Sequence, residues 1–327
     1  MRPVTPQAPQ RDVPGAGSPL ARAVLTGPVR QGLVLATFPT ALYLSAGAHH
    51  EILPVLASDA LLLPTGVRLS AAGRDLDWSV EPGDTVTIGR SGIWLPGWRI
   101  RCVREWRPSR VRAVPNLAHA ALLAELAAIL SRHVPTPELM DQATEVCRAA
   151  RCGDDAEVRR RTRELIGSGQ GLTPSGDDAL CAVLLVLCGL GDPAPIALMG
   201  AAIQEQWTRT TSLSASLLDA ARKGYAVPEV ATLVEATLRG DVAEARDALA
   251  ATLAIGHSSG PDLVAGLAGS LRALATLTLT HHHTHTHTHT RPNTAPAPFE
   301  AVKGLKTVPA RCSDRRFATH STERGNP

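Results

Sequence analysis

A change of hydrophobic pattern near Pro108 constrains the fold of this chain more than any other feature of its sequence. Before it, between Ala21 and Trp106, short apolar stretches alternate with Gly, Pro and Asp, as in strands joined by turns. After it, apolar residues recur at helical spacing. We therefore expect an α+β protein, with a small N-terminal β barrel or sandwich followed by an all-helical C-terminal domain.

The pattern also predicts where the elements and domain boundaries lie. The expected strands are residues 32–38, 41–46, 59–64, 85–89 and 98–103. The expected helices are residues 116–133, 136–151, 154–166, 178–190, 196–207, 212–224, 228–240, 241–256 and 260–277. These divide the chain into a Pro-rich leader (1–19), a β-rich domain (20–108), a helical domain (109–279) and a His/Thr-rich tail (280–327). The leader and the tail are expected to be disordered.

Charge and composition exclude several classes of protein. Residues 281–327 hold seven Lys/Arg and three Asp/Glu, so the other residues together carry a net charge of −1. They lack the clustered cations of a nucleic-acid surface. The longest apolar run, Ala179–Leu190, is too short to cross a bilayer of roughly 30 Å, and the N-terminus has no signal-peptide pattern. We expect a cytoplasmic protein without nucleic-acid or membrane partners.

The loop before the helix at residues 178–190 is unusually rich in glycine. Gly167, Gly169 and Gly171 lie within five residues and permit left-handed backbone conformations. Such a loop can direct successive N–H groups toward one anion. The helix N-terminus that follows also favours negative charge. The loop is therefore a predicted anion site, although a simple turn explains it as well.

Two adjacent aspartates begin that helix. Ser175 and Asp178 fit an S-x-x-D capping box, which leaves Asp177 without a role. Adjacent carboxylates raise each other's pKa values. These carboxylates would repel an anion, unless they accept hydrogen bonds from N–H groups of the ligand or a Mg²⁺ ion bridges them to it. The cofactor stays open, with Mg²⁺ as the ion that would suit the pair, and no residue is assigned as a metal ligand.

Two further helices begin with polar motifs. Ser259-Gly260-Pro261-Asp262 repeats the S-G-x-D pattern of Ser175–Asp178, and a hydroxyl-rich segment, Thr208–Ser214, lies between them. Each start is either a surface cap or part of one site for a shared anion. Lys223 is the only lysine before the tail, so an anion would be held by backbone N–H groups and Arg209.

These motifs give the expected site. The catalytic candidates are Asp177, Asp178 and His257, the last as a hydrogen-bond donor or proton carrier. The substrate-binding candidates are Gly167, Gly169, Gly171, Thr173, Ser175, Gly176, Arg209, Thr210, Thr211, Ser214, Ser258 and Ser259. Gly256–Gly260 also reads G-x-S-x-G, but no strand precedes it, so a nucleophilic Ser258 is not expected.

The same motifs resemble the AllH-like family, whose best known member is a subunit of oxamate carbamoyltransferase in allantoin (purine) degradation. The specific part is GLTPSGDD at Gly171–Asp178, preceded by Gly167 and Gly169; residues 104–108, 209–218 and 256–267 support it. The resemblance covers roughly residues 21–279. It implies carbamoyl transfer, with oxalurate and phosphate giving oxamate and carbamoyl phosphate. It also implies a small phosphate- or carboxylate-type substrate and a hetero-oligomer with other carbamoyltransferase subunits.

Two other functions remain open at this point. One is a non-catalytic subunit that binds a metabolite and regulates a partner. The other is a metal-assisted hydrolase that uses Asp177 and Asp178. Turnover by the chain alone, turnover only with partner subunits, and binding without turnover would distinguish these functions.

Overall fold

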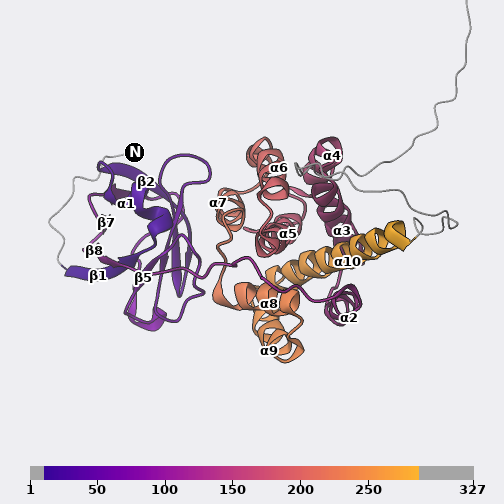
Figure 1. The fold of residues 1–327 in the computed structure, drawn as a ribbon. Helices are drawn as coiled ribbons and strands as arrows, with labels where there is room; N and C mark the ends of the chain where they lie inside the picture. Colours follow the sequence, from indigo (N-terminus) through magenta and orange to yellow (C-terminus); the bar gives the residue numbers. More distant parts are fainter. Residues whose placement is uncertain (1–10, 287–327) are drawn as a thin grey trace, which may run out of the picture.

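The expected α+β architecture is confirmed in the computed structural model, which describes residues 11–286 (Figure 1). The N-terminal part is a closed barrel of eight strands, and the C-terminal part is helical. Of the two β architectures considered from the sequence, the barrel is the one that forms. In Figure 1 the indigo and purple barrel lies to one side of the magenta-to-yellow helices.

The barrel closes because its first and last strands pair in parallel. Its strands are β1 Arg11–Gly17, β2 Arg30–Phe38, β3 Ala41–Ser45, β4 Ile52–Leu56, β5 Val67–Leu69, β6 Thr85–Gly89, β7 Gly92–Leu95 and β8 Trp98–Glu105. Their order around the barrel is β1-β5-β4-β3-β2-β6-β7-β8, and β8 pairs with β1. Short helical turns η1 Pro19–Ala21, α1 Arg22–Thr26 and η2 Gly73–Asp75 connect them.

Two predictions about this region are wrong. Residues 11–19, assigned to a disordered leader, supply β1 and the start of η1, because a barrel without free edges needs a strand between β5 and β8. The remaining leader residues lie outside the described range. Residues 59–64, predicted as a strand, form a loop between β4 and β5, and their apolar run includes cavity-lining side chains instead.

Strand β4 joins the barrel to the helices. Every residue of β4 is buried, which explains its uninterrupted apolar sequence. Leu53 and Val55 belong to the core of the barrel, whereas Ile52 and Leu56 belong to the core of the helical part. The two parts of the molecule therefore share an apolar interface.

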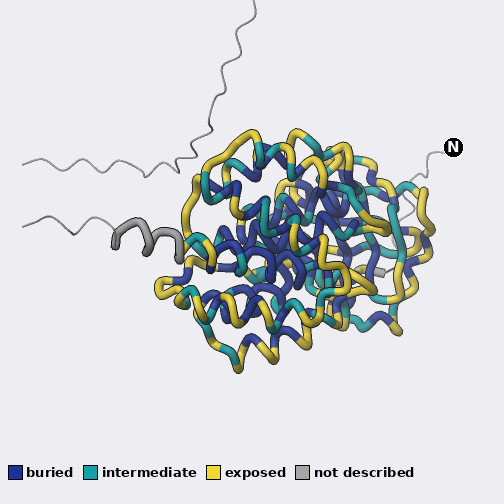
Figure 2. Tube along the Cα trace, turned by 90° about the vertical axis from the view of Figure 1, so that its right-hand side faces the viewer, coloured by how far each residue is buried: buried dark blue, intermediate teal, exposed yellow. Residues whose placement is uncertain are grey.

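The helices surround one buried central helix, α5. They are α2 Ala120–Ser131, α3 Pro137–Cys152, α4 Asp155–Leu165, α5 Ser175–Leu190, α6 Pro193–Gln204, η3 Trp207–Arg209, α7 Ser212–Ala221, α8 Pro228–Arg239, α9 Val242–Leu253 and α10 Ser259–Thr286. The turned view shows this buried interior in dark blue (Figure 2). Between residues 11 and 286, no helix is both long and apolar enough to cross a membrane.

Helix α10 extends further than the sequence pattern suggests. It continues through Thr286, so the prediction that residues 280–286 belong to a disordered tail is wrong. The apolar helical pattern ends near residue 277. The helix continues beyond that point because adding residues to an existing helix forms one further backbone hydrogen bond per residue. The rest of the predicted tail, 287–327, lies outside the described residues.

Helices α5 and α10 cross in close contact. A Cβ atom at Gly266 would lie 2.4 Å from the backbone oxygen of Ala179, so only glycine fits there. Ala179 follows Asp178 in α5, and Gly266 is one turn after Asp262 in α10. The crossing therefore brings two acidic side chains near each other.

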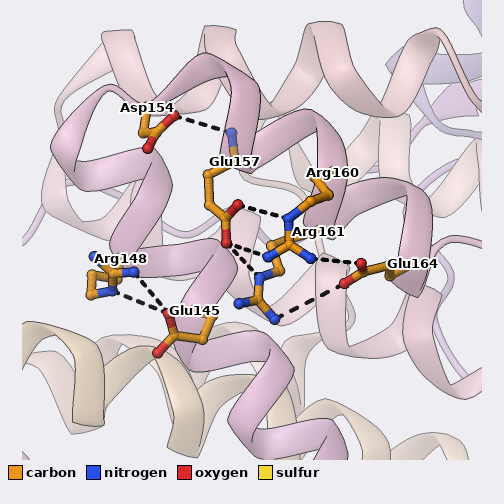
Figure 3. Close-up of polar contacts among 7 residues, drawn as sticks. All are labelled: Glu145, Arg148, Asp154, Glu157, Arg160, Arg161 and Glu164. Atoms are coloured by element: carbon orange, nitrogen blue, oxygen red, sulfur yellow. Dashed lines mark hydrogen bonds and ion pairs between the residues drawn. The ribbon is translucent and has the colours of Figure 1, made fainter. Parts of the chain in front are cut away.

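The outer face of α4 is, by contrast, charged and exposed. Glu157 forms ion pairs with Arg160 and Arg161, and Arg160 also pairs with Glu164 (Figure 3). These residues are spaced three or four apart, so they lie on one face of the helix.

Candidate functional site

The three polar helix starts predicted from the sequence meet in the fold. The hydroxyl oxygens of Thr173 and Ser259 are 2.8 Å apart, which joins the loop before α5 to the start of α10. Thr211 donates a hydrogen bond of 2.5 Å to the backbone oxygen of Leu172. The loop of residues 167–174 therefore contacts the starts of both α7 and α10.

The repeated S-G-x-D motif has a packing explanation. A Cβ atom at Gly176 would lie 2.0 Å from the oxygen of Leu165, at the end of α4. A Cβ atom at Gly260 would lie 2.3 Å from the oxygen of Thr252, at the end of α9. Each glycine lets a helix begin directly against the end of the preceding helix. Glycine at these positions is thus required by packing, independently of any ligand.

The predicted capping box at α5 does not form, so that interpretation is wrong. Pro174 is the residue that precedes the helix, and Ser175 is already its first residue. The N–H groups of Asp177 and Asp178 donate to the oxygen of Pro174, and that of Gly176 donates to Ser168 over 2.9 Å. These three N–H groups of the first turn are used within the chain, which leaves the loop before the helix as the source of N–H groups for an anion.

Asp177 ties the loop to the segment before α7. It is 1% exposed, and its carboxylate accepts hydrogen bonds from the N–H group of Gly167 (2.8 Å) and from the hydroxyl of Thr210. Burial raises the pKa of Asp177, and the hydrogen bonds from Thr210 and Gly167 oppose that shift. Both oxygens of Asp177 thus have hydrogen-bond partners within the chain, and these bonds hold the loop against the segment before α7.

Asp178 has the opposite environment. It is 5% exposed, and its Oδ2 atom has no hydrogen-bond partner among the described residues. Burial raises the pKa of Asp178 well above its ordinary value; hydrogen bonds from the Ser259 and Thr173 hydroxyls oppose the shift, and the charge of Asp262 reinforces it. The Oδ2 atom of the buried Asp262 likewise has no partner within the described part of the chain.

Asp178 lines a cavity of about 230 Å³ between the barrel and the helices. Thr173 and Ser259 lie beside it in the wall, together with Cys181. The rest of the lining is almost entirely aliphatic or aromatic and comes from the barrel and from α5, α7, α8 and α10. The cavity is therefore apolar, with polar groups gathered where the starts of α5 and α10 meet.

The other predicted site residues lie around this cavity rather than in its wall. Gly169, Gly171, Arg209, His257 and Ser258 are exposed, and Ser175 and Thr211 are partly exposed. Ser214 is 1% exposed, and its N–H group donates to the hydroxyl of Thr211 over 3.1 Å. The structure thus brings the three segments together. It separates the buried Asp178 from an exposed rim, which consists of Gly169, Gly171, Arg209, His257 and Ser258.

One contact in this region has no sequence signal. The Nε2 atom of His49, in the loop between β3 and β4, is 3.1 Å from the backbone oxygen of Thr210. Its Nδ1 atom is 3.1 Å from the hydroxyl of Ser212. In the neutral ring, Nε2–H donates to the carbonyl and Nδ1 accepts from the hydroxyl. Neighbouring His50 packs on Trp207 with 4.3 Å between ring centroids. A barrel loop therefore fixes the start of α7, which only the tertiary fold reveals.

A Mg²⁺ ion held by Asp177 and Asp178 does not fit this arrangement. Both oxygens of Asp177 are occupied by donors of the chain, so bridging would break the loop contacts. Within residues 11–286, no group of three or more His, Cys, Asp or Glu side chains could hold a metal ion.

Comparison with known proteins gives one finding. No curated protein and no solved structure matches the chain. The family model for oxamate carbamoyltransferase subunit AllH matches residues 165–271, a segment that includes all three helix starts. The resemblance to the AllH family, seen first in the GLTPSGDD motif, is thereby confirmed over residues 165–271.

Proposed function

We propose that this chain is one subunit of a carbamoyltransferase complex and contributes the starts of α5, α7 and α10 to its substrate site. The observation that carries the proposal is the location of the family match. Residues 165–271 contain all three starts, and contacts such as Thr173–Ser259 hold them together.

The exposed rim supplies groups suited to a small phosphate- or carboxylate-type substrate. Gly169 and Gly171 have φ values of +108° and +91°, and backbone of this kind can direct N–H groups toward an anion. The backbone of Arg209 lies against Gly167 at the start of the same loop, and its exposed side chain supplies a cation. Because the rim faces solvent, the complex would complete the site with residues of another subunit.

The reaction proposed is transfer of the carbamoyl group of oxalurate to phosphate. A phosphate oxygen forms a bond to the carbamoyl carbon, and the bond from that carbon to the oxamate nitrogen breaks. The leaving nitrogen takes up a proton and gives oxamate, beside carbamoyl phosphate. His257, exposed at the start of α10, is the side chain we propose for delivering this proton.

The test combines the chain with its co-expressed partner subunits. We expect phosphate-dependent loss of oxalurate by the mixture and none by the chain alone. Arg209→Gln should lower kcat/KM by about tenfold or more without changing the melting temperature. Arg246→Gln, which changes an exposed arginine of α9 outside the rim, is the matched control.

Two results would count against the proposal. Full turnover by the partners without this chain would show that the chain is not needed by the enzyme. Equal kcat/KM values for Arg209→Gln and Arg246→Gln would show that the rim does not bind substrate, while the assignment of the chain as a subunit would still stand.

A further inference from the structure

We infer that the cavity between the barrel and the helices binds a neutral organic molecule with an apolar body and one primary amide-like end. This ligand differs from the small anion proposed for the rim, and the inference does not depend on the carbamoyl transfer reaction. It rests on the size of the cavity, its apolar lining, the placement of its polar groups and its opening to solvent.

The size and lining of the cavity suit an apolar body of one ring or a short aliphatic chain. Its volume is about 230 Å³, whereas an apolar cavity of roughly 150 Å³ is enough to bind benzene. Leu185, Leu217 and Val230 are among the side chains that form its walls. A space of this size is large for a fold whose interior is otherwise closely packed.

The polar end of the cavity calls for a ligand with both a donor and an acceptor. Asp178 is buried, lines the cavity, and has an Oδ2 atom without a partner among the described residues. A buried polar atom of this kind costs free energy until something hydrogen-bonds to it. The Oδ2 atom can accept an N–H group, and the hydroxyl pair of Thr173 and Ser259 in the same part of the wall can supply an O–H donor. A primary amide matches this acceptor and donor with its N–H group and its carbonyl oxygen.

The charge of the lining excludes an anion. Among the described residues that line the cavity, none is a lysine, an arginine or a histidine. A carboxylate or phosphate inside would lie next to Asp178 and near Asp262 with no opposite charge to offset its lost hydration. An ammonium group would lose its hydration in an apolar space and would need an acceptor for each of its three N–H donors. A neutral ligand avoids both costs.

The cavity is also open to solvent along an apolar edge. Phe38, Leu61 and Leu172 line it and remain 40%, 38% and 40% exposed. Large apolar side chains left exposed together at one opening are characteristic of a ligand entrance. Two of them come from the barrel and one from the loop before α5, so the entrance lies where the two parts of the molecule meet.

The experiment titrates the full-length chain with four probes of similar shape in isothermal calorimetry. Benzamide carries the amide, benzoate an anion, benzylamine a cation, and toluene no polar end. We expect saturable binding of benzamide with 1:1 stoichiometry and affinities lower by about tenfold or more for the other three. Equal or tighter binding of benzoate or benzylamine, or absence of saturable benzamide binding, would overturn the inference.

Two variants locate the binding site. Leu217→Trp fills the cavity from α7 and should abolish benzamide binding. Asp178→Leu removes the polar end and should lower the affinity for benzamide by about tenfold while leaving that for toluene unchanged. Asp247→Asn, at an exposed position of α9, should change neither. Benzamide binding that survives Leu217→Trp would place the ligand elsewhere, and this result decides the matter even if Asp178→Leu fails to fold.

Discussion

Glu157 on α4 and Asp178 on α5 are two carboxylates separated by one loop, and their environments are opposite. Glu157 accepts hydrogen bonds from Arg160 and Arg161, at 2.8 Å from the Nε atom of each (Figure 3). These hydrogen bonds lower the pKa of Glu157 to about 2. Asp178 has hydroxyl groups and another carboxyl group around it, and burial raises its pKa well above the ordinary value.

The comparison distinguishes a surface carboxylate with hydrogen-bond partners from a buried carboxyl group with an oxygen available to a ligand. Around Glu157, every hydrogen-bonding need is met by neighbours on the same helix. At Asp178, the side chain is buried and one oxygen has no hydrogen-bond partner among the described residues. Burial without compensation is rare in a folded protein, and it points to function more specifically than charge density does.

The contrast depends on the close crossing of α5 and α10, so breaking that crossing should have the largest effect. Gly266→Val would force a side chain against the backbone oxygen of Ala179, which lies 2.4 Å from the Cβ position. We expect a loss of about 3 kcal/mol or more in the free energy of unfolding, measured by urea denaturation.

Gly200→Ala is the matched control for this change. Gly200 is also a buried helical glycine, but the nearest atom to a Cβ there is Cδ of Arg222, at 3.6 Å. Alanine should raise the free energy of unfolding by up to about 1 kcal/mol through its higher helix propensity. Equal stabilities for the two variants would mean that α5 and α10 do not cross as closely as described.

The next effect in size concerns Asp177, which resembles Glu157 in being fully partnered and Asp178 in being buried. Asp177→Asn replaces one acceptor oxygen by an NH₂ group, which faces either the N–H group of Gly167 or the hydroxyl of Thr210. We expect the free energy of unfolding to fall by about 1–3 kcal/mol. Asp247→Asn, on the exposed face of α9, should leave it unchanged. An unchanged melting temperature together with lost turnover would instead assign Asp177 to the chemistry.

The sequence pattern predicts the helical part of this fold well and the barrel only in part. Helical spacing is local, so each helix from α2 to α10 is visible in its own residues. Strands β4, β5 and β7 are missed because they have only five, three and four residues, too few to show a clear alternation of apolar and polar residues. Strand β1 is hidden as well, since its residues RDVPGAG have little β propensity and only pairing with β5 and β8 makes them a strand.

The candidate site divides in the same way. The residues of the three helix starts are evident from glycine, hydroxyl and acidic motifs, and their meeting is a prediction that the observed contacts support. Which aspartate is free is not evident, because Asp177 and Asp178 are adjacent and chemically identical. Only the direction each side chain takes from α5 separates them. The contributions of Phe38 and His49 require the barrel to be docked on the helices.

The smallest expected effects come from neutralising the two compared carboxylates, and their pH dependence should have opposite sign. The pKa of Asp178 in the folded protein is above its ordinary value of 3.8, so the folded state binds more protons than the unfolded state. The free energy of unfolding should therefore fall as pH rises from about 4 toward the folded pKa. In Asp178→Asn this side chain cannot ionise, so the free energy of unfolding does not fall for this reason. The stability of the variant relative to the wild type should therefore increase as the pH rises through that range.

For Glu157 the folded pKa of about 2 lies below the ordinary value of 4.5, so the unfolded state binds more protons. Its contribution is present above pH 4.5 and is lost as the pH falls toward 2. Because the pairs of Glu157 are solvent-accessible, Glu157→Gln should cost about 1 kcal/mol or less at pH 7. Urea denaturation of both variants and the wild type between pH 3 and 8 gives two difference curves. Curves with the same slope would show that Asp178 and Glu157 share one environment, and the case for a ligand at Asp178 would lose its electrostatic support.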